Sequence, residues 1–413
     1  MIPAGRDAQL PRAPSAIVSQ HAAEITVRQA LRRLQSRRRP SAARRFRNNI
    51  AVTLDDLRRA VVARTLFTPT TLQRALDALG FVQADPIRAP ARAQDLTLRH
   101  RVAGYRAGDL ERCYRQLNVH EDFFVNYGFV TDQVQALMHP RGGPVPWTAG
   151  RGRHVRALLE FVRMRGSVHP REVDAHFSHG TVTNYWGGSS SATTHLLEAM
   201  HYRGLLRVVG REAGIRIYAT HGHESGPRTA ATRRASLDAL VDVIVRNYAP
   251  LPGASLSSLV RRLRFAVPQW AGELGATLQR ARSRLAHARV DGVDWYWSAE
   301  QAGAGAADDV VRLLAPFDPV VWDRRRFEML WGWAYRFEAY TPVPRRKLGY
   351  YALPLLWRDR VIGWGNLLVK SGTLQSDFGY VTSAPRSRVF RRALEEELHR
   401  LGVFLGLDAL PDD

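Results

Sequence analysis

The chain has few cysteines, few lysines and no long apolar runs. Among its 413 residues Cys113 is the only cysteine, which excludes an intramolecular disulfide and a cysteine-based zinc site. Lys347 and Lys370 are the only lysines. No apolar run approaches the roughly 20 residues that a membrane-spanning helix needs, and the N-terminus lacks the apolar core of a secretory signal. We therefore expect a cytoplasmic protein with no membrane partner.

Arginine, by contrast, is abundant and gives the chain a formal net charge of +22. Residues 1–50 hold eleven arginines against Asp7 and Glu24, so this segment contributes +9 and the remainder contributes +13. A surplus of this size favours a nucleic acid partner, because contacts to phosphates release counterions and dominate affinity. A genome-wide bias toward arginine is the alternative origin of the surplus.

The order of predicted elements divides the chain into a leader and four units. Residues 1–50 are rich in Pro, Ala, Arg and Ser without apolar periodicity, which predicts a mostly disordered leader. We expect a first unit at 51–150, a second at 151–230, a third at 231–300 and, after a Gly/Ala linker, a β-rich domain at 309–410. The second and third units each show three helical stripes followed by two β-rich runs. This is the layout of a winged helix, whose third helix and wing usually contact DNA.

The expected fold class is therefore α+β, with three tandem winged-helix domains followed by a C-terminal β-barrel-like domain. The first domain would be a degenerate copy of the other two. In the third, Asp291-Gly292 predicts the tight turn of the hairpin. Arg203 and Arg207 follow the third predicted helix of the second unit, so we expect both to contact double-stranded DNA. Binding to this DNA would hold the protein at the nucleoid.

The C-terminal domain brings basic and aromatic residues together. Most of its many aromatic rings would fill the interior of the barrel. A basic and aromatic edge would also suit DNA, because rings stack on bases and cations contact phosphates. The expected DNA contacts in this edge are Arg345, Arg346, Lys347, Tyr350 and Tyr351.

The stretch after Gly80 is the strongest candidate for chemistry. We expect a helix from Pro69 to Leu79, which Gly80 ends. Pro86 disfavours helical geometry for the residue before it, so Asp85 is expected to be extended. Side chains two apart in an extended segment point the same way, and Gln83 and Asp85 would then project together.

A run of arginines follows this pair and would hold a polyanion over it. The members expected to contact DNA are Arg88, Arg92, Arg99 and Arg101. The alternative interpretation of the pair is structural, with Asp85 as the N-cap of a helix and Pro86 at its first position.

Two C-terminal blocks carry a family resemblance. The run LAPFDPVVWDRRR at residues 314–326 is similar to a "PFDP…WDR.R" signature, and EAYTPVPRRKLGYYALP at 338–354 is similar to "E.Y.P…R..GYYALP". Both signatures belong to the bacterial YcaQ-type DNA glycosylases, the AlkZ-related crosslink-repair family that this chain resembles over roughly residues 53–400. Gln83-Ala84-Asp85 stands where the family has its catalytic Gln-x-Asp motif.

Two segments depart from the family pattern. Residues 120–129 stand where the family carries Glu-x-Trp-x-His, and Gly363-Trp364-Gly365-Asn366 stands where it carries Gly-Arg-x-Asp. These differences bear on the choice of substrate more than on the fold.

The resemblance implies a DNA repair glycosylase that cleaves the N-glycosidic bond of N7-alkylated purines and unhooks interstrand crosslinks. Asp85 would then stabilise the developing sugar cation or activate a water, and Gln83 would position that water. A lyase normally needs an amine nucleophile, and the two lysines lie far along the chain, which favours a monofunctional hydrolase. The terminal amine is the remaining candidate nucleophile. We expect no cofactor and no metal, because no carboxylate completes a ligand pattern with the histidines at 176–223.

Two other functions fit the same residues. The alternative is a non-catalytic winged-helix DNA-binding protein, either a regulator or a lesion sensor. Such a regulator normally dimerises on paired half-sites, whereas this chain would carry several DNA-binding units in one polypeptide, so we expect a monomer. The other function is a scaffold that uses winged helices for protein contacts, and a lack of salt-dependent DNA binding would reveal it.

Overall fold

The computed structural model describes residues 52–141, 147–177, 180–183, 189–222, 229–299 and 308–407. The predicted leader and nearly all of the Gly/Ala linker lie outside these residues. Small antiparallel sheets and the helices between them form a mixed α/β fold. Within the described ranges, no helix is long and apolar enough to cross a membrane.

Helix α3 (Leu72–Leu79) leads into the candidate site. It begins after Thr71, whose side chain accepts a hydrogen bond from the Arg74 N–H. The prediction of a start at Pro69 is wrong, because Thr70 is held in a short bridge to Val102 instead. Gly80 ends the helix with a φ of 73°, as predicted, in a conformation that glycine adopts without strain. The first segment also contains α2 (Leu54–Thr65), β1 (Phe81–Gln83), α4 (Ala93–Leu98), α5 (Asp109–Cys113), η2 (Tyr114–Gln116), β2 (Val119–Phe123), β3 (Tyr127–Thr131) and α6 (Asp132–Met138).

The second and third segments repeat one order of elements. The second contains α7 (Ala149–Arg165), β4 (Ser167–Val168), α8 (Pro170–Phe177), β5 (Thr181–Thr183), β6 (Ser189–Ser191), α9 (Ala192–Tyr202), β7 (Leu206–Glu212) and β8 (Ile215–Thr220). The third contains α10 (Ala230–Tyr248), β9 (Leu251–Pro252), α11 (Gly253–Arg262), η3 (Leu263–Phe265), η4 (Pro268–Glu273), α12 (Leu274–Arg284), β10 (Ala286–Val290) and β11 (Val293–Trp297).

Three of the sheets also share one strand order. Each places its third strand between the first and the second, as β1-β3-β2, β4-β8-β7 and β9-β11-β10. In each segment a helix, a short strand, further helices and a hairpin follow one another. The sequence predicts the three helices and the hairpin of the second and third segments, but not the short strands β4 and β9. Assignment of the segments as three winged-helix domains with the expected boundaries stays our proposal.

The C-terminal segment forms an open sheet, so the prediction of a barrel-like domain is wrong. It contains β12 (Val311–Leu313), α13 (Arg324–Trp331), η6 (Val343–Arg345), β13 (Leu353–Trp357), β14 (Arg360–Lys370), β15 (Thr373–Tyr380) and α14 (Arg388–Leu405). Its four antiparallel strands run in the order β12-β13-β14-β15, and within the described residues nothing pairs β15 with β12. The rings expected inside a barrel pack elsewhere: Phe327 and Tyr335 lie in a core shared with α10, while Trp357 packs on Phe390 of α14.

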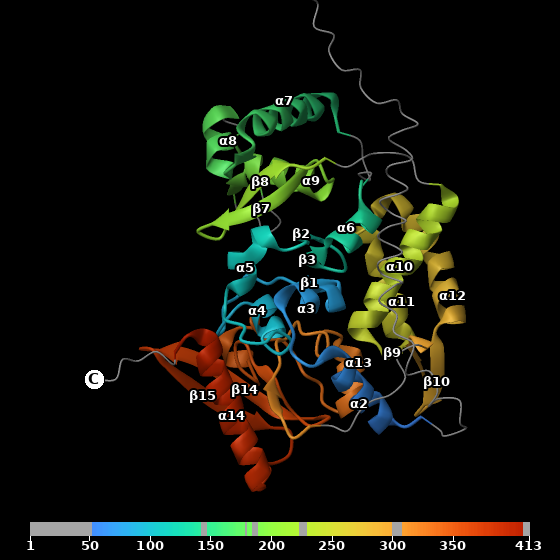
Figure 1. Cartoon of the computed structure of the whole chain (residues 1–413), viewed down its shortest axis with the longest axis vertical. Helices are drawn as coiled ribbons and strands as arrows, with labels where there is room; N and C mark the ends of the chain where they lie inside the picture. Colours follow the sequence, from blue (N-terminus) through green and yellow to red (C-terminus); the bar gives the residue numbers. More distant parts are fainter. Residues whose placement is uncertain are drawn as a thin grey trace, which may run out of the picture.

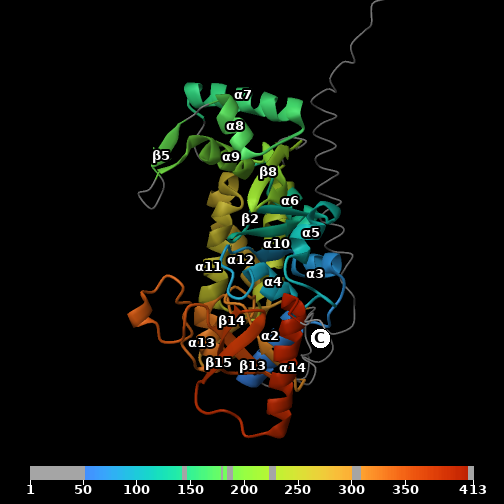
Figure 2. The same ribbon diagram turned by 90° about the vertical axis from the view of Figure 1, so that its left-hand side faces the viewer.

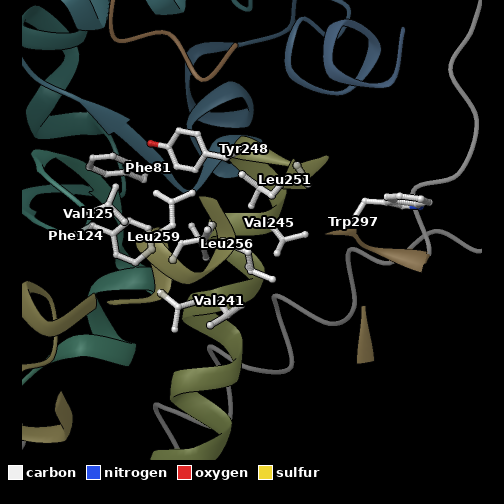
Figure 3. Packing of buried hydrophobic residues seen from close by; sticks show 14 of the residues in the cluster. Phe81, Phe124, Val125, Val241, Val245, Tyr248, Leu251, Leu256, Leu259 and Trp297 are labelled. Atoms are coloured by element: carbon white, nitrogen blue, oxygen red, sulfur yellow. The ribbon is translucent and has the colours of Figure 1, made fainter. Parts of the chain in front are cut away.

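Strand β1 lies between two apolar cores. The central core, formed mainly by α2, α6, α10, α11 and α13, takes Phe81, which packs edge-on against Phe124 at 5.4 Å (Figure 3). The sheet core, formed by α3, α4, β12, β13 and α14, takes Val82. Because neighbouring side chains of a strand point to opposite faces, Gln83 returns to the side of Phe81.

The second segment has a core of its own at one end of the molecule. Figure 1 shows it at the top, with the first segment in the middle, helices α10 to α12 alongside and the C-terminal sheet at the bottom. Charged contacts attach it to the first segment: Glu121 on β2 accepts hydrogen bonds from Arg211 at 2.6 Å and Arg216 at 3.3 Å. The hairpin β7–β8 is therefore docked on β2 within the chain.

Candidate functional site

Gln83 is the last residue of β1, and its amide is held in one orientation. Its Oε1 accepts a hydrogen bond from Asn126 Nδ2 at 2.8 Å and another from Trp322 Nε1 at 2.7 Å. An indole nitrogen can only donate, so the oxygen of the amide must face Trp322. The Gln83 Nε2 therefore points away from Trp322 and is the group of this side chain left to donate.

Arg262 lies behind Asn126 and holds it against this amide. The Asn126 Oδ1 accepts a hydrogen bond from Arg262 at 2.5 Å, and the Arg262 Nε donates to the Val125 carbonyl at 2.9 Å. The Arg262 guanidinium also lies 5.5 Å from the centre of the Trp322 ring, and burial lowers its pKa. Residues from three segments thus fix the orientation of Gln83.

Asp85 lies in an irregular loop after β1. The helix-capping alternative is wrong, because α4 begins only at Ala93. One carboxylate oxygen accepts a hydrogen bond from the Ile87 N–H at 2.9 Å, and the Asp85 N–H donates to the Gln94 Oε1 at 3.3 Å. The other carboxylate oxygen, Oδ2, has no hydrogen-bond partner among the described residues. Partial burial raises the pKa of Asp85, against the opposing effect of the Ile87 N–H.

Arg99 and Arg101 are structural residues rather than DNA contacts. Arg101 is fully buried and binds Asp318 through two hydrogen bonds of 2.8 and 3.0 Å. Arg99 is bonded to the buried Glu397 and donates to the Leu313 carbonyl at 3.1 Å. We therefore withdraw the prediction that these two arginines hold a polyanion, because their guanidinium groups neutralise interior carboxylates.

Arg88 and Arg92 differ in how much of each side chain is exposed to solvent. Arg88, three residues after Asp85, is exposed. Arg92 is half-buried and paired with Glu111, and burial together with the positive charge of Arg88 lowers its pKa. Arg88 thus offers a charge near Asp85 that no described carboxylate neutralises.

The two arginines predicted in the second segment lie at the start of its wing. Arg207, on β7, is exposed. The Arg203 guanidinium packs 3.8 Å from the ring centre of Trp147, with Arg151 at 4.9 Å from the same ring. A cationic, aromatic surface thus lies beside α7.

A projecting segment, residues 332–350, carries the other predicted contacts. The orange loop that bears η6 extends away from the body in Figure 2. The Glu338 carboxylate stabilises this segment by accepting hydrogen bonds from the N–H groups of Lys347 and Leu348, each at 2.8 Å. Asn366, which departs from the family pattern, anchors it by donating to the Leu348 carbonyl at 2.8 Å.

The side chains of this segment are mostly open to solvent. Arg345, Lys347 and Tyr350 are exposed, and the Arg346 guanidinium lies 5.1 Å from the Tyr350 ring. Tyr351 is different, since only 3% of its surface is exposed. The prediction of Tyr351 as a DNA contact is therefore wrong, because its ring belongs to the sheet core.

Sequence reasoning missed the residues that orient Gln83. Trp322 lies inside the block at 314–326, so that block carried a signal for it. Asn126 and Arg262 gave none, because their relation to Gln83 exists only after folding. No group of three or more His, Cys, Asp or Glu side chains in the described part of the chain is placed to hold a metal ion.

Comparisons with known proteins identify the family of the chain. Residues 76–404 match the model of the family described as DNA glycosylase AlkZ-like. The fold is similar to the DNA glycosylase AlkZ of Streptomyces sahachiroi, with a TM-score of 0.57 and 15% identity over 88% of this chain and 99% of that one. Since the family match spans the Gln83–Asp85 pair, the C-terminal sheet and most of the chain between its ends, this protein belongs to the AlkZ-like DNA glycosylase family.

Proposed function

We propose that the chain hydrolyses the N-glycosidic bond of N7-alkylated purines in double-stranded DNA. The pairing of Gln83 with Asp85 carries this proposal. An amide held by two donors lies two residues before a half-buried carboxylate that has one oxygen free of hydrogen bonds within the described residues. Such a pair suits a reaction in which positive charge develops on a sugar while a water is positioned.

Alkylation at N7 makes the purine cationic and a good leaving group. As the bond between C1′ and N9 breaks, its electron pair passes to the base and neutralises it. The negative charge of Asp85 stabilises the cation left on the sugar. Asp85 then accepts a proton from the water whose oxygen bonds to C1′, and the Gln83 Nε2 donates to that water. A raised pKa makes the Asp85 carboxylate a stronger base.

We propose two groups of DNA contacts around this pair. Arg88 and Arg92 would bind phosphates beside Asp85, and the projecting segment would contribute Arg345, Arg346, Lys347 and the ring of Tyr350. Arg203 and Arg207 would contact the duplex farther from the reaction, through the second segment.

The proposal extends to interstrand crosslinks formed through N7, because the N-glycosidic bond whose cleavage unhooks such a crosslink is the same kind of bond. It also takes the enzyme to be a monofunctional hydrolase. The cleavage needs only a water and a carboxylate, and neither lysine belongs to the group of residues that orient Gln83 or hold Asp85.

Release of 7-methylguanine from alkylated duplex DNA tests the proposal, with wild type beside Asp85→Asn and Gln83→Ala. We expect release by wild type that falls at least about tenfold in Asp85→Asn, roughly 1.4 kcal/mol of barrier, with DNA affinity retained. Asp77→Asn is a matched control, since Asp77 lies on α3 outside the loop that holds Asp85.

No release from methylated or crosslinked DNA, with equal DNA binding by all variants, would contradict the proposal. That result would favour the alternative function, a non-catalytic protein that binds DNA as a regulator or lesion sensor.

A further inference from the structure

The projecting segment carries large apolar side chains that are open to solvent. Tyr340 is 77% exposed and Val343 is 70% exposed, and Pro342 and Pro344 beside them are exposed as well. These four residues form an apolar tip on the loop that extends from the body in Figure 2. Apolar side chains gathered on an exposed surface mark a place where a partner binds. The apolar tip is therefore a candidate contact surface.

Hydrogen bonds within the segment hold the apolar tip in one shape. The Thr341 N–H donates to the Glu338 carbonyl at 2.9 Å, and the Arg346 Nε donates to the Thr341 carbonyl at 2.8 Å. One oxygen of the Glu338 carboxylate also accepts from the backbone N–H groups of residues 347–349. Because these contacts close the segment on itself, little chain entropy remains to be lost when the tip binds a partner.

A row of aromatic rings supports the tip and joins it to the interior. The Tyr340 ring packs edge-on against Phe337, with the ring centres 6.0 Å apart. Phe337 in turn packs edge-on against Tyr351 at 5.3 Å and against Phe317 at 5.2 Å. Since Tyr351 is buried in the sheet core, the Tyr340 ring is backed by fixed side chains.

The sheet core connects this support to the candidate site. Phe337 packs against the sheet core. Ala84 and Ile87, which flank Asp85, pack against the same core. The apolar tip and the loop of Asp85 are therefore anchored to one packed interior.

The charges of the projecting segment favour DNA as the partner of the tip. Its cationic side chains are Arg336, Arg345, Arg346 and Lys347, of which only Arg346 is half-buried. Glu338 is its one acidic residue, and this carboxylate is buried against backbone N–H groups. Phosphates would bind the cations, and the spaces between base pairs accept apolar side chains.

We propose that the apolar tip is a wedge, whose Tyr340 and Val343 side chains insert between neighbouring base pairs of duplex DNA held by the cations of the segment. This rests on the proposed binding of DNA by the projecting segment. Apolar side chains that enter a base step unstack it and kink the duplex, and an aromatic ring stacks on the base face that is uncovered. In an opened stack the neighbouring bases no longer hold an alkylated purine, so its release becomes easier.

The fluorescence of 2-aminopurine tests the wedge, because this base brightens when it loses its stacked neighbours. The probe is a duplex with 2-aminopurine placed in turn at each position around a 7-methylguanine. A 2′-fluorine on the sugar of the 7-methylguanine disfavours the sugar cation and so prevents cleavage. We expect the fluorescence to rise when wild type saturates the duplex.

Variants of the tip identify the side chains that cause the rise. Tyr340→Phe retains the ring and should retain the rise, whereas Tyr340→Ser should lose most of it and Val343→Ser a part. All three changes affect exposed side chains, so folding should be preserved. Met164→Ser is the matched control, because Met164 on α7 is 73% exposed and lies between Arg163 and Arg165, and it should give the rise of wild type.

The salt dependence of DNA binding separates the wedge from the phosphate contacts. Tyr340→Ser removes no charge, so it should weaken binding about tenfold at every salt concentration, the scale of one lost stacking contact. The slope of log K against log salt should stay that of wild type. Arg345→Gln should instead make this slope shallower by about 0.9, because one phosphate contact is lost.

Two outcomes would overturn the wedge. One is a bound duplex that shows no rise in fluorescence with wild type at any position of the probe. The other is a rise and an affinity that are the same in Tyr340→Ser, Val343→Ser and wild type, which would assign the tip to a protein partner instead.

The proposed function fails separately from the wedge. Intact release of 7-methylguanine by Asp85→Asn would refute the proposed mechanism, whatever the fluorescence shows. Loss of release in Asp85→Asn, together with a fluorescence rise that does not depend on Tyr340, would refute the wedge alone.

Discussion

The Trp322 indole donates to the Gln83 amide oxygen at 2.7 Å and joins two residues 239 positions apart. The amide belongs to β1 and the indole to the C-terminal segment, so the site is assembled from both ends of the described chain. Tyr248 of the central core packs against Trp322, with the two ring centres 5.3 Å apart. The central core therefore holds Trp322 in the position that orients the Gln83 amide.

We expect Trp322→Phe to slow release of 7-methylguanine about three- to tenfold. The substitution preserves an aromatic ring but removes the donor, a loss of about 0.5–1.5 kcal/mol, and the amide can then turn its oxygen toward the reacting water. Single-turnover kinetics at saturating enzyme measures this effect apart from DNA affinity. Trp331→Phe is the control, since the Trp331 indole donates to the Asp359 carbonyl, away from Gln83. Equal rates for wild type and Trp322→Phe would refute the role of the indole.

Gly128→Ala should destabilise the protein by more than about 2 kcal/mol. Gly128 lies opposite Gln83 in the pairing of β3 with β1, and a Cβ there would come within 2.2 Å of the Val82 carbonyl oxygen. The two strands must separate to relieve the contact, which removes ladder hydrogen bonds from the strand that carries the site. Urea denaturation followed by circular dichroism gives the free energy of unfolding. Gly272→Ala should change it little, because a Cβ at Gly272 meets nothing within 4 Å.

Asp318→Asn should lower the free energy of unfolding by about 3–5 kcal/mol. Both side chains of the Arg101–Asp318 pair are fully buried, and the substitution leaves the Arg101 charge uncompensated. Asp309→Asn breaks a pair with Arg358 that is exposed on both sides, and it should cost no more than about 1 kcal/mol. An equal loss in the free energy of unfolding in the two variants would show that burial does not determine how much an ion pair stabilises the protein.

The protein should lose stability as the pH falls below about 6.5. Burial lowers the pKa of His139 and of His201, and it lowers that of His221 to about 3. Between the folded pKa and the unfolded value of about 6.5, the unfolded chain binds more protons, so the free energy of unfolding falls with pH in that window. The difference between the midpoints of thermal unfolding at pH 7.5 and 5.5 measures this loss of stability. The difference should be smaller in His221→Gln than in wild type. A loss in this variant as large as in wild type would exclude His221 as a contributor.

The enzyme should leave an abasic site without breaking the strand. Borohydride reduces the imine between a lysine and an abasic sugar, and we expect no protein–DNA adduct after its addition, because the proposed mechanism uses water as nucleophile. Denaturing gel electrophoresis of protein and labelled DNA detects both products. Lys347→Met should likewise form no adduct and leave an abasic site in an unbroken strand. An adduct that disappears in Lys347→Met would instead identify a lyase.

Local features of this fold were predictable from sequence where neighbouring residues determine them. Gly80 ends α3 in the left-handed conformation, and Asp291 and Gly292 form the hairpin turn with φ values of 48° and 76°. The two C-terminal blocks indicated the family that the comparison shows.

Features that depend on distant partners were not predictable. The buried arginines resemble surface cations in sequence, because their partners Asp318 and Glu397 lie 217 and 298 positions away. The prediction of a barrel was wrong for a related reason. A high content of aromatic residues predicts that the rings are buried, but it does not predict in which core they pack. Within the candidate site, the sequence predicts a role for Gln83 and Asp85, which stays a proposal, whereas the contacts that bring Asn126 and Arg262 to Gln83 come from tertiary structure alone.

The burial of the Arg101–Asp318 pair has a practical consequence for handling the protein. Dissolved ions screen charges in contact with solvent, and at about 1 M salt the screening length is only about 3 Å, so cationic surfaces release nucleic acid. The same ions do not reach a pair that is fully enclosed. A high-salt wash should therefore strip cellular nucleic acid from the purified protein while the ion pair between the turn after α4 and the C-terminal segment remains intact. Return to low salt should then restore an enzyme free of nucleic acid without refolding.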